Sequence, residues 1–201
     1  MRQLRAVESG SHRRFVGDPR PRARARTTRA AALLAGAAPL LLGAACGSGT
    51  TGRASFQDGL AAQAKGQLDT ARADYNQALA NDPNNQSGDN KYAYFNLGVM
   101  DQQQGNSAAA SSEYRRALLI DPNFVNAIYN LAIVETPSQP QSAILLYQQI
   151  LSLKPHDPNT LYNLGLLLYD TGQISQGQAL LRQAIQIAPS LSSKLPAGVH
   201  I

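Results

Sequence analysis

Residues 91–124 read KYAYFNLGVMDQQQGNSAAASSEYRRALLIDPNF, and residues 158–191 read PNTLYNLGLLLYDTGQISQGQALLRQAIQIAPSL. Both stretches carry the same landmarks in the same order, and two further copies lie at residues 52–85 and 125–157. Each copy has two small residues, then a bulky side chain, then a proline: Gly59, Ala71, Tyr75 and Pro83; Gly98, Ala110, Tyr114 and Pro122; Ala132, Ala143, Tyr147 and Pro155; Gly165, Gly177, Leu181 and Pro189. Successive prolines are 39, 33 and 34 residues apart, which indicates a repeated structural unit.

The order and the period of these landmarks resemble those of the tetratricopeptide repeat (TPR) family over residues 52–191. The resemblance implies an all-α fold, a right-handed α-solenoid of four helix-turn-helix units. We expect the units at 52–85, 91–124, 125–157 and 158–191, followed by a C-terminal tail at 192–201. Stacked units bury a core that one unit cannot bury alone, and four units are enough for this.

Local residue chemistry agrees with a division into helix pairs. The small landmarks are expected where the two helices of a unit cross, because a small residue lets backbones approach closely. Gly66, Gly105 and Gly172 predict the turns of units one, two and four, whereas TPSQP at residues 136–140 replaces the glycine turn in unit three. Each repeat proline disfavours helical geometry in the residue before it, so the second helix should end there. An insertion at residues 86–90 accounts for the longer spacing after unit one.

The net charge of +5 is concentrated before Cys46, where nine arginines stand against Glu8 and Asp18. After Cys46, acidic residues slightly outnumber basic ones, so the repeats are mildly acidic. A nucleic-acid-binding surface needs clustered Lys and Arg on the folded part of a protein. The repeats therefore do not have the composition of a nucleic-acid-binding protein.

Residues 1–45 form a predicted signal peptide. Arginines run to Arg29, and an uncharged stretch follows at residues 30–45, AAALLAGAAPLLLGAA. This stretch is shorter than the roughly 20 residues of a membrane span, and the pattern is that of a secretory signal peptide. The ending LGAAC at residues 42–46 resembles the lipobox of bacterial lipoproteins, in which the cysteine is lipidated and becomes the N-terminus. Ordinary secretion and an uncleaved anchor are the alternatives, and Arg13-Arg14 faintly resembles a twin-arginine export signal.

Residues 46–51 are predicted to form the lipidated Cys46 and a flexible tether rich in glycine, serine and threonine. In the lipoprotein family this cysteine carries more than one acyl chain, which gives a stable membrane anchor. We therefore expect an exported protein, held at a cell membrane by lipid and facing the periplasm or the cell exterior.

A row of side chains lies next to the core-facing stripe on the first helix of every unit, and we expect it to line the concave side of the stack. Each unit contributes an aromatic residue, the amide that follows it, and an aliphatic residue one turn later. The predicted groove residues are Phe56, Gln57, Phe95, Asn96, Val99, Asn126, Tyr129, Asn130, Ile133, Asn159, Tyr162, Asn163 and Leu166.

The amides of this row offer a way of binding a peptide. A carboxamide both donates and accepts hydrogen bonds, so one amide per unit could hold the backbone of an extended chain. The resemblance implies the same, since some TPR proteins use asparagine ladders. The alternative is that the row serves packing between helices. The one cation in the row is Arg53, so a clamp for an acidic C-terminal tail is not expected, and an apolar or neutral segment fits better.

Unit four is apolar nearly all round its first helix, at Leu164, Leu166, Leu167, Leu168 and Tyr169. A helix of this kind must be buried. Three covers are open at this stage: the tail at residues 195–201, a second copy of the chain, or another protein.

No constellation of residues predicts catalysis, a metal site or a cofactor. His12, His156 and His200 are far apart in sequence, and Cys46 is the one cysteine. We expect a non-enzyme, a lipid-anchored adaptor or scaffold that binds a protein or peptide at the cell envelope. The alternative is a self-associating structural component of the envelope, a homo-oligomer through unit four. Regulation of a membrane-bound enzyme by docking is a third hypothesis.

Overall fold

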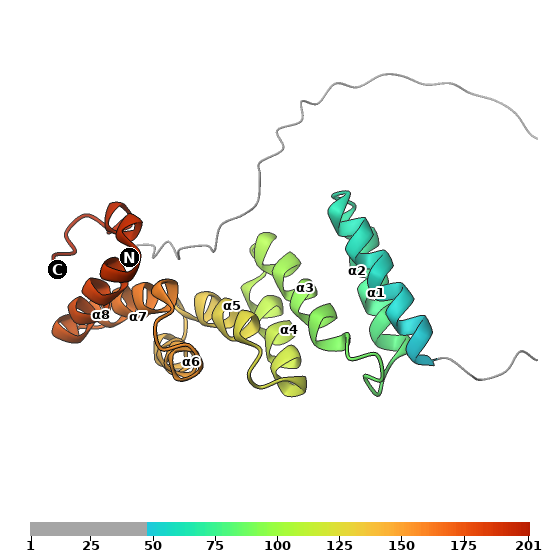
Figure 1. The fold of residues 1–201 in the computed structure, drawn as a ribbon. Helices are drawn as coiled ribbons and strands as arrows, with labels where there is room; N and C mark the ends of the chain where they lie inside the picture. The colour runs from blue at the N-terminus through green and yellow to red at the C-terminus, as the bar shows by residue number, and fades with distance from the viewer. Residues whose placement is uncertain (1–47) are drawn as a thin grey trace, which may run out of the picture. The chain divides into compact units, whose positions relative to one another are not determined.

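The computed structural model describes the backbone of residues 48–201 and the side chains from Thr50 on. These residues form α-helices and one closing 3-10 helix, with no strand among them (Figure 1). In chain order they are α1 (Ser48–Ala64), α2 (Leu68–Asn81), α3 (Asn90–Gln103), α4 (Ser107–Ile120), α5 (Val125–Glu135), α6 (Pro140–Leu153), α7 (Pro158–Asp170), α8 (Ile174–Ile187) and η1 (Pro189–Lys194). The predicted signal peptide and Cys46 lie outside the described residues. None of the helices in residues 48–201 has both the length and the apolar character needed to cross a membrane.

The helices pack as four successive pairs. Helix α1 packs on α2, α3 on α4, α5 on α6 and α7 on α8, and neighbouring pairs meet through α2 and α3, α4 and α5, and α6 and α7. The second helix of each pair ends two residues before the repeat proline, at Asn81, Ile120, Leu153 and Ile187. The all-α helical-repeat solenoid predicted from the sequence is therefore confirmed.

The turns within the units follow the predicted chemistry. Gly66, Gly105 and Gly172 have φ angles of +73°, +79° and +89°, a left-handed conformation that glycine adopts without strain. In unit three, α5 ends at Glu135 and α6 begins at Pro140. Two different kinds of turn thus produce the same helix pair.

Close packing of the two helices depends on the small landmarks. A Cβ atom added to Gly98 would lie 2.7 Å from Cε1 of Tyr114, and one added to Gly59 would lie 2.7 Å from the ring of Tyr75. Cβ atoms do not approach other atoms this closely in proteins. The tyrosine rings therefore fill the space that the missing side chains leave, and the predicted helix crossing is confirmed.

The start of the repeats differs from the prediction. The sequence predicted a flexible tether at residues 46–51, whereas α1 already begins at Ser48. The added helical turn rests against the end of α2, where Gly52 is buried and a Cβ added to it would lie 2.6 Å from Cβ of Asp82. Tertiary contact thus extends the helix into a segment whose composition is typical of a linker.

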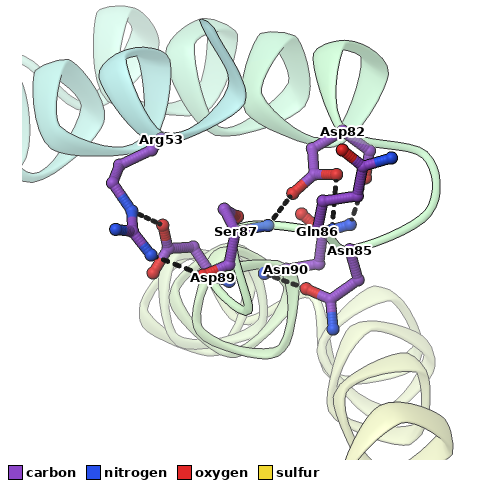
Figure 2. A network of polar contacts seen from close by, with 7 residues as sticks. All are labelled: Arg53, Asp82, Asn85, Gln86, Ser87, Asp89 and Asn90. Carbon is purple, nitrogen blue, oxygen red and sulfur yellow. Dashed lines mark hydrogen bonds and ion pairs between the residues drawn. The ribbon is translucent and has the colours of Figure 1, made fainter. Parts of the chain in front are cut away.

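The insertion after unit one forms a hydrogen-bonded loop between α2 and α3 (Figure 2). The Asp82 carboxylate accepts hydrogen bonds from the backbone N–H groups of Gln86 and Ser87, both at 2.7 Å. The Asn90 backbone N–H donates to Oδ1 of Asn85 at 3.1 Å, and Nδ2 of Asn90 donates to the Asp82 carbonyl at 2.7 Å. Hydrogen bonds from the side chain and backbone of Ser87, and from the backbone of Gln86, hold the pKa of the Asp82 carboxyl below its ordinary value. The loop is therefore a defined spacer between units one and two.

The end of unit four is covered by the chain's own tail. Leu191 of η1 is buried in an apolar cluster formed by α7 and α8, and Leu195 and Val199 pack against that cluster. The tail thus occupies the face for which the sequence left three covers open. A homo-oligomer through unit four stays a prediction.

Candidate functional site

The predicted groove residues lie on the first helices of the four units, α1, α3, α5 and α7. Some are exposed and most are partly exposed: Gln57, Phe95, Asn96, Val99, Asn126, Tyr129, Asn130, Ile133 and Asn159. We call this set the binding row. Its contact with a ligand stays a prediction.

Four other predicted groove residues are in the core instead: Phe56, Tyr162, Asn163 and Leu166, which are 6%, 1%, 6% and 5% exposed. Phe56 packs between Tyr75 and Tyr92, with ring centroids 5.7 Å and 6.5 Å away. Tyr162 and Leu166 belong to the cluster that the tail covers. The predicted groove position of these four residues is therefore corrected to a packing position.

Two asparagines of the predicted groove bond to tyrosines of the preceding unit. Nδ2 of Asn130 donates to the Tyr114 hydroxyl at 3.3 Å, and Nδ2 of Asn163 donates to the Tyr129 hydroxyl at 2.8 Å. In both cases an amide on the first helix of one unit links that unit to the unit before it. This contact favours the packing alternative for the asparagine ladder.

The junction between units one and two has a matching contact. Burial raises the pKa of Tyr75 to about 12, and a side-chain hydrogen bond with Asn96 lowers that pKa in part. The hydroxyl therefore stays protonated at neutral pH and can donate a hydrogen bond. It donates to Oε1 of Gln63 at 2.5 Å, as the Tyr114 hydroxyl donates to Oε1 of Gln102 at 2.6 Å. Tyr75 and Tyr114 thus each satisfy their hydroxyl through two neighbouring amides.

Charged side chains also cross the first two junctions. Nη2 of Arg72 lies 2.7 Å from Oδ1 of Asp101, which pairs units one and two. Glu135, 1% exposed, pairs with Arg115 and accepts a hydrogen bond from Oγ of Ser111 at 3.1 Å, which ties unit three to unit two. A buried carboxylate needs such partners because removing a charge from water is costly.

The junction between units three and four is apolar at the same positions. Leu168 stands in α7 where Asp101 and Glu135 stand in α3 and α5, three residues after the small landmark. Ile144 stands in α6 where Arg72 stands in α2. Leu168 and Ile144 belong to one buried cluster. The acid position of the first two junctions and the arginine position of the first therefore carry hydrophobic contact at the third.

Sequence reasoning missed two aromatic residues beside the binding row. Tyr92, 41% exposed, lies edge-on to Phe124 with ring centroids 5.4 Å apart, and Phe124 lies 5.2 Å from Phe95. Tyr92 occupies the same repeat position in α3 as Asn126 in α5, so the register that predicted Asn126 contained the signal for it. Phe124 lies between two helices, where helical periodicity gives no signal.

The cations near the binding row are already paired with carboxylates. Arg53 of α1 reaches the loop of Figure 2, where its Nε lies 3.1 Å from Oδ2 of Asp89 and its Nη2 donates to the Ser87 carbonyl at 2.6 Å. Nζ of Lys91 lies 2.7 Å from Oδ2 of Asp121 and holds the pKa of that carboxyl below its ordinary value. A ligand carboxylate would have to compete with these pairs. Within residues 48–201, no cluster of three or more His, Cys, Asp or Glu side chains is placed to hold a metal ion.

Comparisons with solved structures find the same fold. A tetratricopeptide repeat protein from Parabacteroides merdae is 21% identical over 69% of this chain, with a TM-score of 0.64, and the match spans 54% of that protein. MamA from Desulfovibrio magneticus RS-1 is 17% identical over 70% of this chain and 77% of its own, with a TM-score of 0.62. YrrB, described as a TPR protein with an unusual peptide-binding site, is 17% identical over 74% of this chain and 77% of its own, with a TM-score of 0.60. No curated protein gives a significant match.

Family models identify the repeats from the amino-acid sequence. Models described as tetratricopeptide repeat match residues 53–85, 92–124 and 138–193. Together these matches span more than half of the chain and coincide with units one and two and with most of units three and four. The helix pairs, the glycine-dependent crossings and these matches agree, and the chain belongs to the tetratricopeptide repeat family.

Proposed function

We propose that this protein is an adaptor or scaffold that binds a protein or peptide partner through the binding row and the adjoining aromatic residues. The observation that carries the proposal is the exposure of apolar side chains on neighbouring first helices. Leu60 and Tyr92 are 38% and 41% exposed, and Phe95 and Val99 beside them are partly exposed. TPR folds typically serve protein–protein interaction, and the peptide-binding site described for YrrB makes a peptide a suitable class of ligand.

The chemistry of the row favours an apolar or neutral ligand segment. Arg53 and Lys91 already pair with Asp89 and Asp121, so an acidic tail gains little from them. Tyr92 offers a partly exposed ring that an apolar side chain can cover. The exposed amides of Gln57 and Asn126 can pair with the backbone of an extended segment, whereas the asparagines at the junctions are engaged within the stack.

Photo-crosslinking tests this proposal. A photoreactive amino acid would replace Tyr92 or Asn126 in the full-length chain, and Leu119 of α4, 84% exposed, serves as the control position. We expect the same crosslinked partner from Tyr92 and Asn126 and none from Leu119. Equal capture at Leu119, or no partner from either row position, would contradict binding at the row.

We further propose that the protein is exported and anchored to a membrane by a lipid on Cys46. The support is the arginine-rich segment, the apolar stretch that follows it and the LGAAC ending. Helix α1 begins only two residues after Cys46, so an acyl group there would hold unit one directly beside the membrane surface.

Substitution of the cysteine tests the anchor. Cys46→Ala should remove the lipid and shift the protein from the membrane fraction to the soluble fraction. Ser48→Ala, a matched change two residues later, should leave the membrane fraction unchanged. Full membrane retention of the Cys46→Ala protein without any acyl group would show that another feature holds it there.

A further inference from the structure

The cover that the tail provides over unit four is incomplete. Leu195 and Val199 are only partly buried against α7 and α8, and Ile201 is 43% exposed. Two hydrogen bonds fix this segment: the Tyr169 hydroxyl donates to the Gly198 carbonyl at 3.2 Å, and Nε2 of Gln178 donates to the His200 carbonyl at 2.8 Å. In both bonds the tail supplies an acceptor and the unit supplies the donor.

A buried hydroxyl beneath this cover has no partner. The Tyr162 side chain is 1% exposed, and its hydroxyl makes no hydrogen bond with any described residue. Tyr129 stands at the same repeat position in α5, and its hydroxyl accepts a hydrogen bond from Asn163 of the following unit. The Tyr162 hydroxyl therefore lies where an amide from a following helix would be expected.

An arginine at the edge of the same face repeats a second junction feature. Arg182 follows the bulky landmark Leu181 in α8, as Arg115 follows Tyr114 in α4. Arg115 pairs with Glu135 of the next unit, whereas Arg182 is exposed and its Nε donates only to the Gln178 carbonyl of its own helix, at 3.4 Å. No carboxylate among the described residues forms an ion pair with Arg182. This face therefore has the arginine found at a junction but no carboxylate that pairs with it.

From these features we infer that the terminal face of α7 and α8 is a docking site for an amphipathic helix of a partner protein, which displaces residues 195–201. The internal junctions specify the chemistry of that helix: Asn163, at the repeat position of Asn96 and Asn130, shows that an amide there reaches the equivalent of Tyr162, and the first two junctions add the acid. The amide and the acid are five residues apart in both, Asn96 with Asp101 and Asn130 with Glu135. The partner helix should therefore carry an Asn or Gln for Tyr162 and, five residues later, an Asp or Glu for Arg182, on an otherwise apolar face. The inference rests on the proposed function as a protein-binding adaptor.

A second copy of the chain does not fit this site, because its α3 and α5, which carry the amide and the acid, are packed within their own stack. Its first helix α1 offers Gln57 at the amide position, but Ala62 stands where the acid is required, and Ala62 is buried within its own unit. Asp58 stands where the internal junctions bury Leu97, Leu131 and Leu164. Docking α1 on this face would bury an unpaired carboxylate, which is strongly unfavourable. The occupant is therefore a different protein.

A labelled helical peptide tests the site. The probe is a fluorescein-labelled peptide with the sequence of residues 124–137, FVNAIYNLAIVETP, which carries the amide and the acid in register. It would be hydrocarbon-stapled, because a helix this short is marginal in water. Binding to the full-length chain, and to a variant that ends after Lys194, is measured by fluorescence anisotropy. We expect saturable binding that is at least tenfold tighter for the shortened variant.

Reversing the charges of Arg182 and of the peptide glutamate tests whether these two groups are in contact. Arg182→Glu should weaken binding by about tenfold or more, because hydrogen bonds to charged groups are the stronger ones. A peptide with Lys in place of its glutamate should restore binding to the Arg182→Glu protein. Tyr162→Phe should weaken binding of the Asn-bearing peptide and not of a peptide with Ala in its place. Lys154→Glu, the same charge reversal at an exposed position of unit three, should change none of these affinities.

Two results would overturn the inference. One is absence of binding to both the full-length and the shortened protein, and the other is equal weakening by Arg182→Glu and Lys154→Glu. Either result leaves the binding row untouched if crosslinking from Tyr92 and Asn126 still captures the same partner. Loss of that crosslinking, with peptide binding at unit four intact, would instead remove the binding row from the proposed function.

Discussion

Removal of the hydroxyl group should destabilise the protein at Tyr114 but not at Tyr162, although both tyrosines are buried. The Tyr114 hydroxyl donates to Gln102 and accepts from Asn130, so Tyr114→Phe deletes two hydrogen bonds without opening a cavity. Each such bond contributes about 0.5–1.5 kcal/mol net, so the free energy of unfolding should fall by about 1–3 kcal/mol. The Tyr162 hydroxyl is equally buried and has no partner. Since an unpaired buried hydroxyl is itself unfavourable, Tyr162→Phe should leave stability unchanged or raise it by up to about 1 kcal/mol.

Urea unfolding followed by circular dichroism at 222 nm measures both effects. The chain has no tryptophan, so helix content is the suitable signal. Tyr92→Phe is the control, because Tyr92 is partly exposed and the change there should stay within about 0.5 kcal/mol. A loss of stability for Tyr162→Phe equal to that for Tyr114→Phe would refute the reasoning. It would mean either that the Tyr162 hydroxyl has a partner or that the junction bonds do not stabilise the stack.

Three further changes test the packing of the stack. Gly98→Ala places a Cβ 2.7 Å from the Tyr114 ring and should cost about 1–3 kcal/mol, and an unchanged melting temperature would place the helix crossing elsewhere. Glu135→Gln removes the charge that faces Arg115 and should cost about 1–2 kcal/mol at low salt, with a smaller loss at high salt, when urea midpoints are compared. The pKa of Asp82 is lowered by folding, so its stabilising effect is present above the unfolded pKa near 3.8 and is lost as the pH falls through the folded-state pKa. Stability measured from about pH 7 down to about pH 3 should therefore fall less for Asp82→Asn than for the unchanged chain, and parallel curves would contradict the role of this carboxylate.

The helix pairs could be predicted because their signals are local in sequence. Pro122 ends a helix through its own ring, and Gly105 forms a turn through its own φ angle, so neither depends on distant residues. The small residue at 98 also predicts its contact, since one repeat geometry fixes which residue faces it. These features explain why the repeat register agrees with the structure.

The role of the asparagines could not be read from the sequence in the same way. Successive residues are about 100° apart around a helix, so a side chain between the core stripe and the groove can point toward the core or toward the groove. The choice for Asn130 depends on how far unit three is shifted along unit two, which brings its amide to the Tyr114 hydroxyl. That shift results from the packing of the whole stack. The sequence could not select the tail among the three covers for a related reason, because Pro196 and Gly198 interrupt the apolar pattern of Leu191, Leu195 and Val199.

The change in chemistry along the three junctions has a consequence for the order of folding. In a linear repeat array each unit is stabilised mainly by its immediate neighbours. The Ile144–Leu168 junction needs no charge, whereas the two junctions before it depend on ion pairs that acid and salt weaken. We expect units three and four to form the nucleus of folding, with units two and one added in turn. Since synthesis proceeds from the N-terminus, units one and two are made before this nucleus, and we expect their folding to wait for it.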